Sequence, residues 1–344
     1  MLSSNLYSAL RAILYYYLII FSIYPYSIMS TDPNTSNNNN NKLFNLVLVT
    51  YFKNEALNIR EFIRHYINEG VEHFYMIDNG STDNYLEIIN HDIPKGLITI
   101  VRDDHNHTLP EGLQNNLLRK YFTSLLINEA NWVIIVDLDE FIYSTDMTST
   151  ISDTLNKFDY NVKRIFLLWK LFGGNNVIKH PVNDSLVKTF NARAEFHIAP
   201  SVINLGAGLY GHGKMIVRVS NKLLLETHAS LTDDNHVYLP IYNSQPIFTY
   251  EINNNGHRQI SENTSDLFRE EFLHHHVLQL NHYSYQSREY YEKYKTIRGG
   301  GQSGHTSKYT IEFYDKHANS KHNNLIFDDE LYRKNTAMKH KPLV

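Results

Sequence analysis

Two aspartates separated by one residue, Asp137 and Asp139, are the part of this 344-residue chain with the clearest chemistry. They follow an apolar run, Trp132 to Val136, that is typical of a strand buried on both faces. Because residues i and i+2 beyond a strand project to the same side, both carboxylates can reach one hard divalent cation. Oxygen ligands suit Mg²⁺ or Mn²⁺, and such ions stabilise the charge on a leaving diphosphate.

The same pair has other interpretations, because Asp-x-Asp also occurs by chance and caps helices or turns. A haloacid-type hydrolase likewise carries Asp-x-Asp after a strand, but after its first strand and usually followed by Thr. Here the pair follows the fourth expected strand and continues to Glu140 and Phe141. This position favours the metal interpretation.

A second polar cluster, Asp78 to Asp83, follows another apolar run. It is either an ordinary junction between strand and helix, with Ser81 or Thr82 as the N-cap, or the place where Asp78 accepts hydrogen bonds from the base or ribose of a nucleotide. The spacing alone does not separate the two.

The elements that must position these clusters appear as an alternation of apolar runs and amphipathic stretches. The pattern predicts strands at 43–50, 73–77, 97–101 and 132–136, and helices at 55–69, 85–90 and 113–126. Such alternation favours parallel pairing with right-handed crossovers, hence an α/β fold with an open, doubly wound, mostly parallel sheet. Because ligands bind such sheets at the carboxyl ends of the strands, the polar clusters should meet at one edge.

The remainder is less regular, with strands expected at 165–169 and 214–219 and a helix at 290–297. The hydrophobic content of 42% suffices for a full core, so we expect one catalytic domain, 42–344, with halves at 42–145 and 146–344. A net charge of −4 gives no support for a nucleic-acid partner. The absence of cysteine excludes disulfides, Cys-ligated zinc and thiol nucleophiles.

Residues 12–29 carry no charged side chain, and Arg11 stands directly before them. A spanning helix needs about 20 apolar residues, so we expect residues 1–30 to be a signal-anchor, with a cleaved signal peptide or a soluble apolar helix as alternatives. The Asn-rich stretch at 31–41 reads as a linker. An anchor would make the protein membrane-associated and single-pass, with its domain in a secretory-pathway lumen, whereas the alternatives leave a soluble or secreted form open.

Several motifs resemble, in the same order, those of the family 2-like and family 92 glycosyltransferases. They are the segments YFKNE at 51–55, EFIRHY at 61–66, GVEHFY at 70–75, DNGSTD at 78–83, WVIIVDLDEF at 132–141, NHYSYQS at 281–287 and KTIRG at 295–299. The resemblance implies a GT-A fold, a metal ion, usually Mn²⁺ (or Mg²⁺), and a nucleotide-sugar donor, often UDP-linked.

The resemblance also implies roles for individual residues. Asp137 and Asp139 match the metal motif, and His282 matches a histidine that completes metal or diphosphate binding, with His228 as its rival and a structural histidine as the alternative. The donor-binding residues implied are Asn54, Glu55, Asp78, Asp83, Lys214 and Arg298.

The reaction implied is transfer of a hexose to a hydroxyl of a glycan or glycoprotein, with inversion favoured. An inverting enzyme needs an Asp or Glu base within about 3 Å of the acceptor hydroxyl. Glu195, Asp184 and Glu226 are the candidates, and no motif selects among them.

Two other classes of protein remain as alternatives. A catalytically inactive GT-A-fold protein would bind carbohydrate without turnover, although the intact acidic pair and His282 argue against it. A nucleotidyltransferase or phosphoryl-transfer enzyme would need a Gly-rich phosphate loop after the first strand, where this chain has Thr50 to Glu55 instead.

Overall fold

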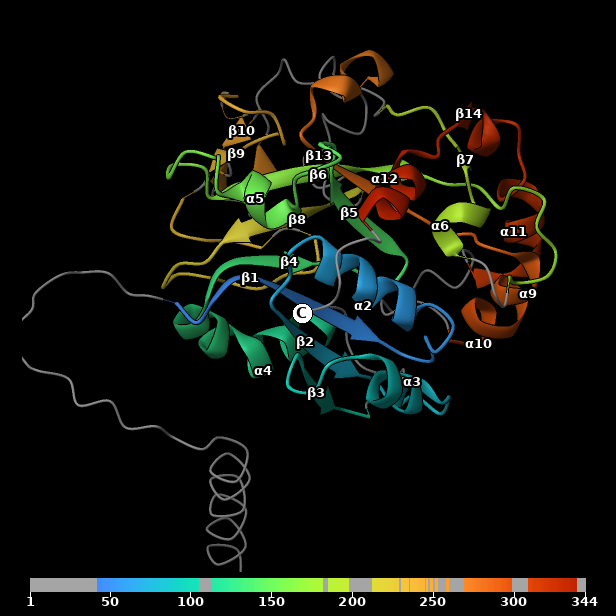
Figure 1. Ribbon diagram of the computed structural model, residues 1–344, viewed down its shortest axis with the longest axis horizontal. Helices are drawn as coiled ribbons and strands as arrows, with labels where there is room; N and C mark the ends of the chain where they lie inside the picture. The colour runs from blue at the N-terminus through green and yellow to red at the C-terminus, as the bar shows by residue number, and fades with distance from the viewer. Residues whose placement is uncertain are drawn as a thin grey trace, which may run out of the picture. The chain divides into compact units, whose positions relative to one another are not determined.

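The computed structural model of the chain divides into two units, Met1–Asn41 and Lys42–Val344 (Figure 1). The structure describes residues 42–104, 113–181, 185–197, 212–298 and 309–338, apart from gaps at 229, 235, 245, 247, 250, 253–257 and 260–268. The expected signal-anchor and Asn-rich linker therefore lie outside the described residues. Within the described ranges, no helix is both long enough and apolar enough to cross a bilayer.

A mixed sheet forms the centre of the described domain. Its eight strands are β1 (Phe44–Phe52), β2 (His73–Asp78), β3 (Ile98–Arg102), β4 (Ala130–Ile135), β5 (Glu140–Ser144), β6 (Arg164–Leu171), β8 (Gly213–Arg218) and β13 (Leu278–His282). They are arranged in the order β3-β2-β1-β4-β8-β6-β13-β5. The first four are parallel, β8 is antiparallel to β4 and β6, and β13 is parallel to β6 but antiparallel to β5. The predicted α/β sheet is therefore confirmed.

Successive residues of the central strands point into two different cores, as the twofold period of a strand requires. The covering helices are α2 (Ile59–Asn68), α3 (Tyr85–Asp92) and α4 (Leu113–Glu129). Leu48 of β1 packs in one core with Phe62 of α2, and the neighbouring Val49 packs in the other core with Phe122 of α4. The strands are therefore buried on both faces, which explains their continuous apolar sequences.

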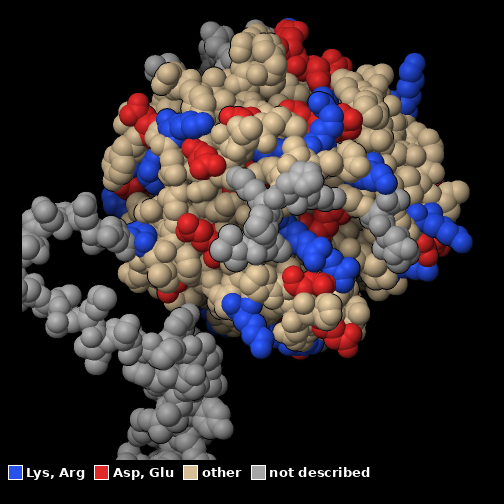
Figure 2. All heavy atoms as spheres, in the orientation of Figure 1, with Lys and Arg blue, Asp and Glu red and all other residues tan. Residues whose placement is uncertain are grey.

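Shorter elements complete the described chain. The helical ones are α5 (Ile151–Leu155), α6 (Leu186–Thr189), η2 (Glu270–His275), α11 (Ile311–His317), η5 (His322–Asn324) and α12 (Glu330–Met338). The strands are β7 (Ala192–Arg193), β9 (His236–Val237), β10 (Phe248–Thr249), β11 (Glu251–Ile252), β12 (Arg258–Gln259) and β14 (Ile326–Phe327). On the face seen in Figure 2, acidic and basic side chains of the described residues are intermixed.

The helix expected at 290–297 is present but has three parts. They are α9 (Arg288–Tyr290), a π-helical turn η3 (Tyr291–Lys295) and α10 (Thr296–Arg298). The Ser287 hydroxyl accepts a hydrogen bond from the Tyr290 N–H (3.1 Å) and so caps the first turn. Apolar periodicity predicts a helix here but carries no signal for the π turn, which depends on tertiary contacts.

A buried lysine ties the C-terminal helix α12 to β5 and to Glu69. Lys334 Nζ lies 2.9 Å from Glu69 Oε1 and donates to the carbonyls of Ser144 (2.6 Å) and Ser149 (2.8 Å). Neither charged side chain is more than 1% exposed. Burial raises the pKa of Glu69 to about 7 although Lys334 lies beside it. The pair fixes the end of β5, the strand that begins at the acidic motif.

We predict that Lys334→Met lowers the free energy of unfolding by about 3–5 kcal/mol, because it leaves Glu69 buried without its counter-charge. Urea denaturation followed by circular dichroism measures this loss. The double variant Lys334→Met/Glu69→Gln should recover a large part of it, since the amide is neutral. If the double variant is as unstable as the single one, lost packing is the cause and the ion pair is not.

Candidate active site

A tight turn between β4 and β5 carries the two aspartates. The Glu140 side chain folds back over this turn: Oε2 accepts a hydrogen bond from the Asp137 N–H (2.9 Å), and the Glu140 N–H donates to the Asp137 carbonyl (3.1 Å). The Tyr66 hydroxyl donates to the Glu140 carbonyl (3.0 Å) and accepts from the Ile142 N–H (2.9 Å). These bonds satisfy buried backbone groups and hold the turn in one conformation.

Strand β13 brings His282 to this turn. Antiparallel pairing with β5 sets His282 opposite Glu140, and the Tyr283 N–H donates to the Asp139 carbonyl (2.8 Å). His282 Nε2 lies 3.6 Å from Asp139 Oδ1, and its ring packs on Trp169 of β6 with centroids 4.4 Å apart. The structure thus places His282 beside the acidic pair, and its role as a metal ligand stays a prediction.

His228, the rival of His282, also lies at this end of the sheet. Its Nδ1 is 3.0 Å from the Gly213 carbonyl, and its ring centroid is 6.0 Å from that of Trp169. The ring of His212 is 6.3 Å from Trp169. His282 and His228 therefore both lie next to Trp169, a residue to which the sequence analysis assigns no role.

Each aspartate has an ammonium partner. Lys214 Nζ lies 3.0 Å from Asp137 Oδ2 and 3.4 Å from Glu140 Oε2, and Lys295 Nζ lies 2.6 Å from Asp139 Oδ2. Lys214 and Glu140 are buried, whereas the Asp137 side chain is 42% exposed. Asp137 is therefore the acidic group of this cluster that faces solvent, whereas Lys214, Glu140, Asp139 and Lys295 are buried.

Burial controls the ionisation of the groups around the turn. It raises the pKa of Glu140 to about 8, an effect that Lys214 opposes and the neighbouring carboxylates reinforce. It lowers the pKa of His282 and of His228 to about 4. Both imidazoles are consequently neutral at pH 7 and retain a nitrogen lone pair for a ligand.

The chemistry of this cluster fits a hard divalent cation. Asp137 and Asp139 offer carboxylate oxygens, neutral His282 offers a nitrogen, and Glu140 Oε1 is buried with no hydrogen-bond partner among the described residues. In the part of the chain that the structure describes, no three His, Asp or Glu side chains are arranged to hold an ion. The lysines hold the aspartates instead, so a cation would have to displace them.

Asp78, the expected nucleotide-binding aspartate, is fully buried at the end of β2. Its Oδ1 accepts from the Ser81 N–H (2.7 Å), its Oδ2 accepts from the Tyr85 hydroxyl (2.9 Å), and Arg102 lies 3.3 Å from Oδ2. Asp78 therefore shapes the loop that follows β2. Contact with a donor stays a prediction.

The N-cap predicted at Ser81 or Thr82 is wrong. Helix α3 begins one turn later, with Asn84 at the capping position and no side-chain cap. The local reason is that Asn54 engages both hydroxyls: the Ser81 hydroxyl accepts from the Asn54 N–H (2.9 Å), and the Thr82 hydroxyl donates to Asn54 Oδ1 (3.4 Å), so both residues belong to the loop.

Three further predicted donor residues join loops of the nucleotide half. Asn54, at a left-handed φ of 52°, accepts the Thr82 N–H on Oδ1 (2.8 Å), and Asp83 Oδ2 accepts the Ala56 N–H (2.7 Å). Glu55 is buried, and its Oε2 accepts from the Tyr290 hydroxyl (3.0 Å). These side chains hold the loops after β1 and β2 together and attach helix α9 to them. Their contact with a donor remains untested.

The candidate bases are separated. Glu195 is exposed after β7, and Glu226 pairs with Arg119 of α4 at 2.6 Å. Asp184 lies outside the described residues, as does the side chain of Arg298, whose backbone ends α10. The geometry selects no base.

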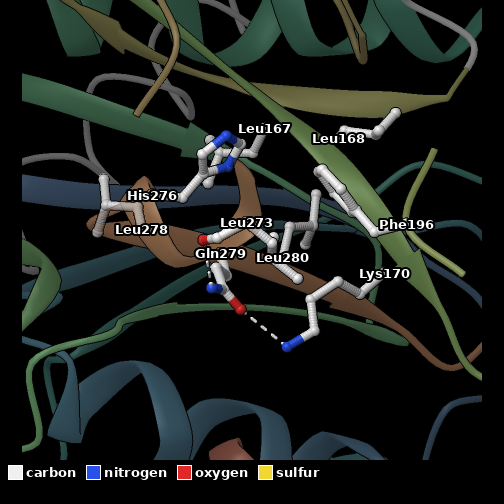
Figure 3. A pocket seen from close by; sticks show the side chains of 9 residues that line it. All are labelled: Leu167, Leu168, Lys170, Phe196, Leu273, His276, Leu278, Gln279 and Leu280. Atoms are coloured by element: carbon white, nitrogen blue, oxygen red, sulfur yellow. Dashed lines mark hydrogen bonds between the residues drawn. The ribbon is translucent and has the colours of Figure 1, made fainter. Parts of the chain in front are cut away.

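A small space lies beside β6 and β13 (Figure 3). It is lined by Leu167, Leu168, Lys170, Phe196, Leu273, His276, Leu278, Gln279 and Leu280. Lys170 Nζ lies 2.7 Å from Asp328 Oδ2 and donates to Gln279 Oε1 and to the Tyr143 hydroxyl (both 2.8 Å). The Lys170 ammonium is thus paired with Asp328 and bonded to two further side chains. We therefore assign this space to the structural core.

The chain belongs to glycosyltransferase family 92, whose sequence profile matches residues 47–298. The matched stretch contains the acidic turn, both lysines that pair with it and His282. Family membership and the order of the strands confirm the GT-A class of α/β fold. No curated protein sequence matches the chain.

Among solved structures the chain is similar to TarS of S. aureus in complex with UDP, at 19% identity over 51% of this chain and 47% of that one (TM-score 0.31). It is also similar to glucosyl-3-phosphoglycerate synthase from Mycobacterium tuberculosis in complex with Mn²⁺ and UDP-glucose, at 13% identity over 51% and 56% (TM-score 0.29). A third is core-mannan synthase A from Aspergillus fumigatus in its Mn/GDP form, at 12% identity over 45% and 51% (TM-score 0.25). The chain spans about half the length of these structures.

Glu140, Trp169 and Lys295 have no role among the sequence predictions, yet all three contact the predicted metal residues. Lys295 opens the KTIRG segment, so the sequence does contain a signal for it. Trp169 contacts His282 because β6 pairs with β13, and no local sequence pattern predicts that pairing.

We predict that the protein loses stability as the pH rises from 4.5 to about 8, in part because of Glu140. Its pKa rises from 4.5 to about 8 on folding, so over this interval the folded state binds a proton that the unfolded chain has lost. In Glu140→Gln the pH slope of the unfolding free energy should be shallower by up to about 1.4 kcal/mol per pH unit. Urea denaturation with EDTA at several pH values measures it, and an unchanged slope would show that Glu140 is ionised throughout.

Proposed function

We propose that the chain is a metal-dependent glycosyltransferase that moves a hexose from a nucleotide-diphosphate sugar, with a UDP-linked donor favoured, to a hydroxyl of a glycan or glycoprotein. The observation that carries this is the acidic turn at the carboxyl end of β4, where Asp137 meets Lys214 of β8, and Asp139 meets His282 of β13 and Lys295 of η3. Membership of family 92 supports it.

In this proposal Asp137 and Asp139 hold a Mn²⁺ or Mg²⁺ ion, with His282 beside them. The ion would supply positive charge for the diphosphate as it leaves. Lys214, already directed at Asp137, would add a charge-assisted hydrogen bond to the same group. Glu140 and Tyr66 keep the turn rigid, so the carboxylates need little rearrangement.

The transfer itself forms a bond between the acceptor oxygen and the anomeric carbon while the bond from that carbon to the phosphate oxygen breaks. We propose inversion, in which an Asp or Glu takes the proton of the acceptor hydroxyl. Glu226 and Glu195 are the candidates within the described residues, and Asp184 is the third. We further propose that residues 12–29 anchor the protein in a membrane, with the domain in a secretory-pathway lumen.

The test is a screen of UDP-, GDP- and other nucleotide sugars with the purified full chain, in Mn²⁺, Mg²⁺ or EDTA. We expect metal-dependent release of the nucleoside diphosphate from one donor. In Asp137→Asn/Asp139→Asn this rate should fall by about a hundredfold or more, because the amides bind a divalent cation poorly and leave the diphosphate charge uncompensated.

Asp159→Asn is the matched control, because Asp159 is an exposed acid before β6, at the opposite end of that strand from the acidic turn, and should leave the rate unchanged. Turnover that persists in EDTA, or in the double variant, would contradict the metal role. A folded wild-type chain that binds glycans but turns over no donor would instead be an inactive carbohydrate-binding member of the fold.

A further inference from the structure

Lys295 is the last residue of the π-helical turn η3. A π turn inserts one residue into an α-helix, occurs often at functional sites and persists where tertiary contacts hold it. Those contacts are present here. Tyr290, just before the turn, donates to Glu55, and Tyr291 packs on Tyr314 with ring centroids 4.9 Å apart. The turn is thereby fixed with Lys295 directed at the acidic motif.

The surroundings of Lys295 differ from those of Lys293 on the same turn. Lys295 is buried, and its Nζ lies 2.6 Å from Asp139 Oδ2 and also donates to the Ser284 carbonyl. Lys293 is 63% exposed and pairs with Glu289 at 2.7 Å. The first lysine belongs to the candidate site, and the second is an ordinary surface residue of the helix.

An ammonium group and a divalent cation compete for the same carboxylate oxygen. Lys295 compensates the charge of Asp139, whose side chain is only 9% exposed and would be costly to bury alone. A cation bound to Asp139 would repel this ammonium group. The same cation would attract the oxygens of a diphosphate, and these oxygens could then accept a hydrogen bond from the displaced lysine. Lysine suits an exchange between the two, because its charge is compact and its stem is flexible.

We propose that Lys295 is a further donor-site residue, which neutralises Asp139 in the free protein and binds a phosphate oxygen of the nucleoside diphosphate once a cation occupies the acidic motif. This inference rests on the function proposed above. It gives the diphosphate two lysine partners, Lys214 from β8 and Lys295 from η3, each of which pairs with one aspartate when no donor is bound.

The experiment compares two affinities of the full chain: Mn²⁺ alone, from the spin-resonance signal of free Mn²⁺, and UDP or GDP in saturating Mn²⁺, by calorimetry. In Lys295→Met the competing ammonium is gone, so Mn²⁺ alone should bind about threefold or more tightly. The nucleoside diphosphate should bind about tenfold more weakly, because a charge-assisted hydrogen bond is lost. Lys295→Arg, which keeps the charge, should lie between Lys295→Met and wild type in both affinities.

Lys293→Met removes a lysine from the same turn and should match the wild type in both measurements. A purely structural lysine would weaken both affinities together or change neither, and either result in Lys295→Met overturns the proposal. If the wild type binds neither Mn²⁺ nor a nucleoside diphosphate, the proposed function fails and this role fails with it. If it binds both and Lys295→Met equals the wild type, only the role of Lys295 fails.

Discussion

Antiparallel hydrogen bonding between β5 and β13 joins the acidic turn to a strand from the far end of the sequence. Because this register sets His282 opposite Glu140, the imidazole reaches Asp139, and the helix that follows β13 returns Lys295 to the same carboxylate. A one-residue slip would turn His282 to the other face of the sheet, where Lys170 and Gln279 lie. The composition of the site therefore depends on the register of one strand pair.

The second constraint is electrostatic. Glu140 and Asp139 are buried beside each other, which is tolerable because Lys295 pairs with Asp139, Lys214 and the Asp137 N–H contact Glu140, and burial raises the pKa of Glu140 to about 8. The same arrangement suits a site for a charged ligand. Lysine ammonium groups leave the carboxylates at this turn polar and hydrogen-bonded, whereas an apolar filling would not. The site and the core around it are thus stabilised by the same ion pairs.

Buried polar contacts hold the described C-terminal elements against the rest of the domain. Lys334 ties α12 to the end of β5, Lys170 ties Asp328 to β6, and Tyr290 ties the helix containing η3 to the loop after β1. Each anchor is a polar group buried with its partner, so each specifies one arrangement rather than a range of them. Residues implied as donor ligands, such as Glu55, take part in this anchoring.

The sequence alone predicts the alternating strands and helices and the position of Asp137 and Asp139 at a strand end, because apolar periodicity and strand-end polarity are local properties. It also points to the family through the motifs that contain Asp137, His282 and Lys295. The tertiary structure decides which charges meet: Lys295 with Asp139, Trp169 with His282, and Tyr290 with Glu55. It also turns part of the helical segment 288–298 into a π turn and uses Ser81 in a loop rather than as a cap. These contacts join residues far apart in the chain through strand register and helix docking, and no local pattern of residues encodes that geometry.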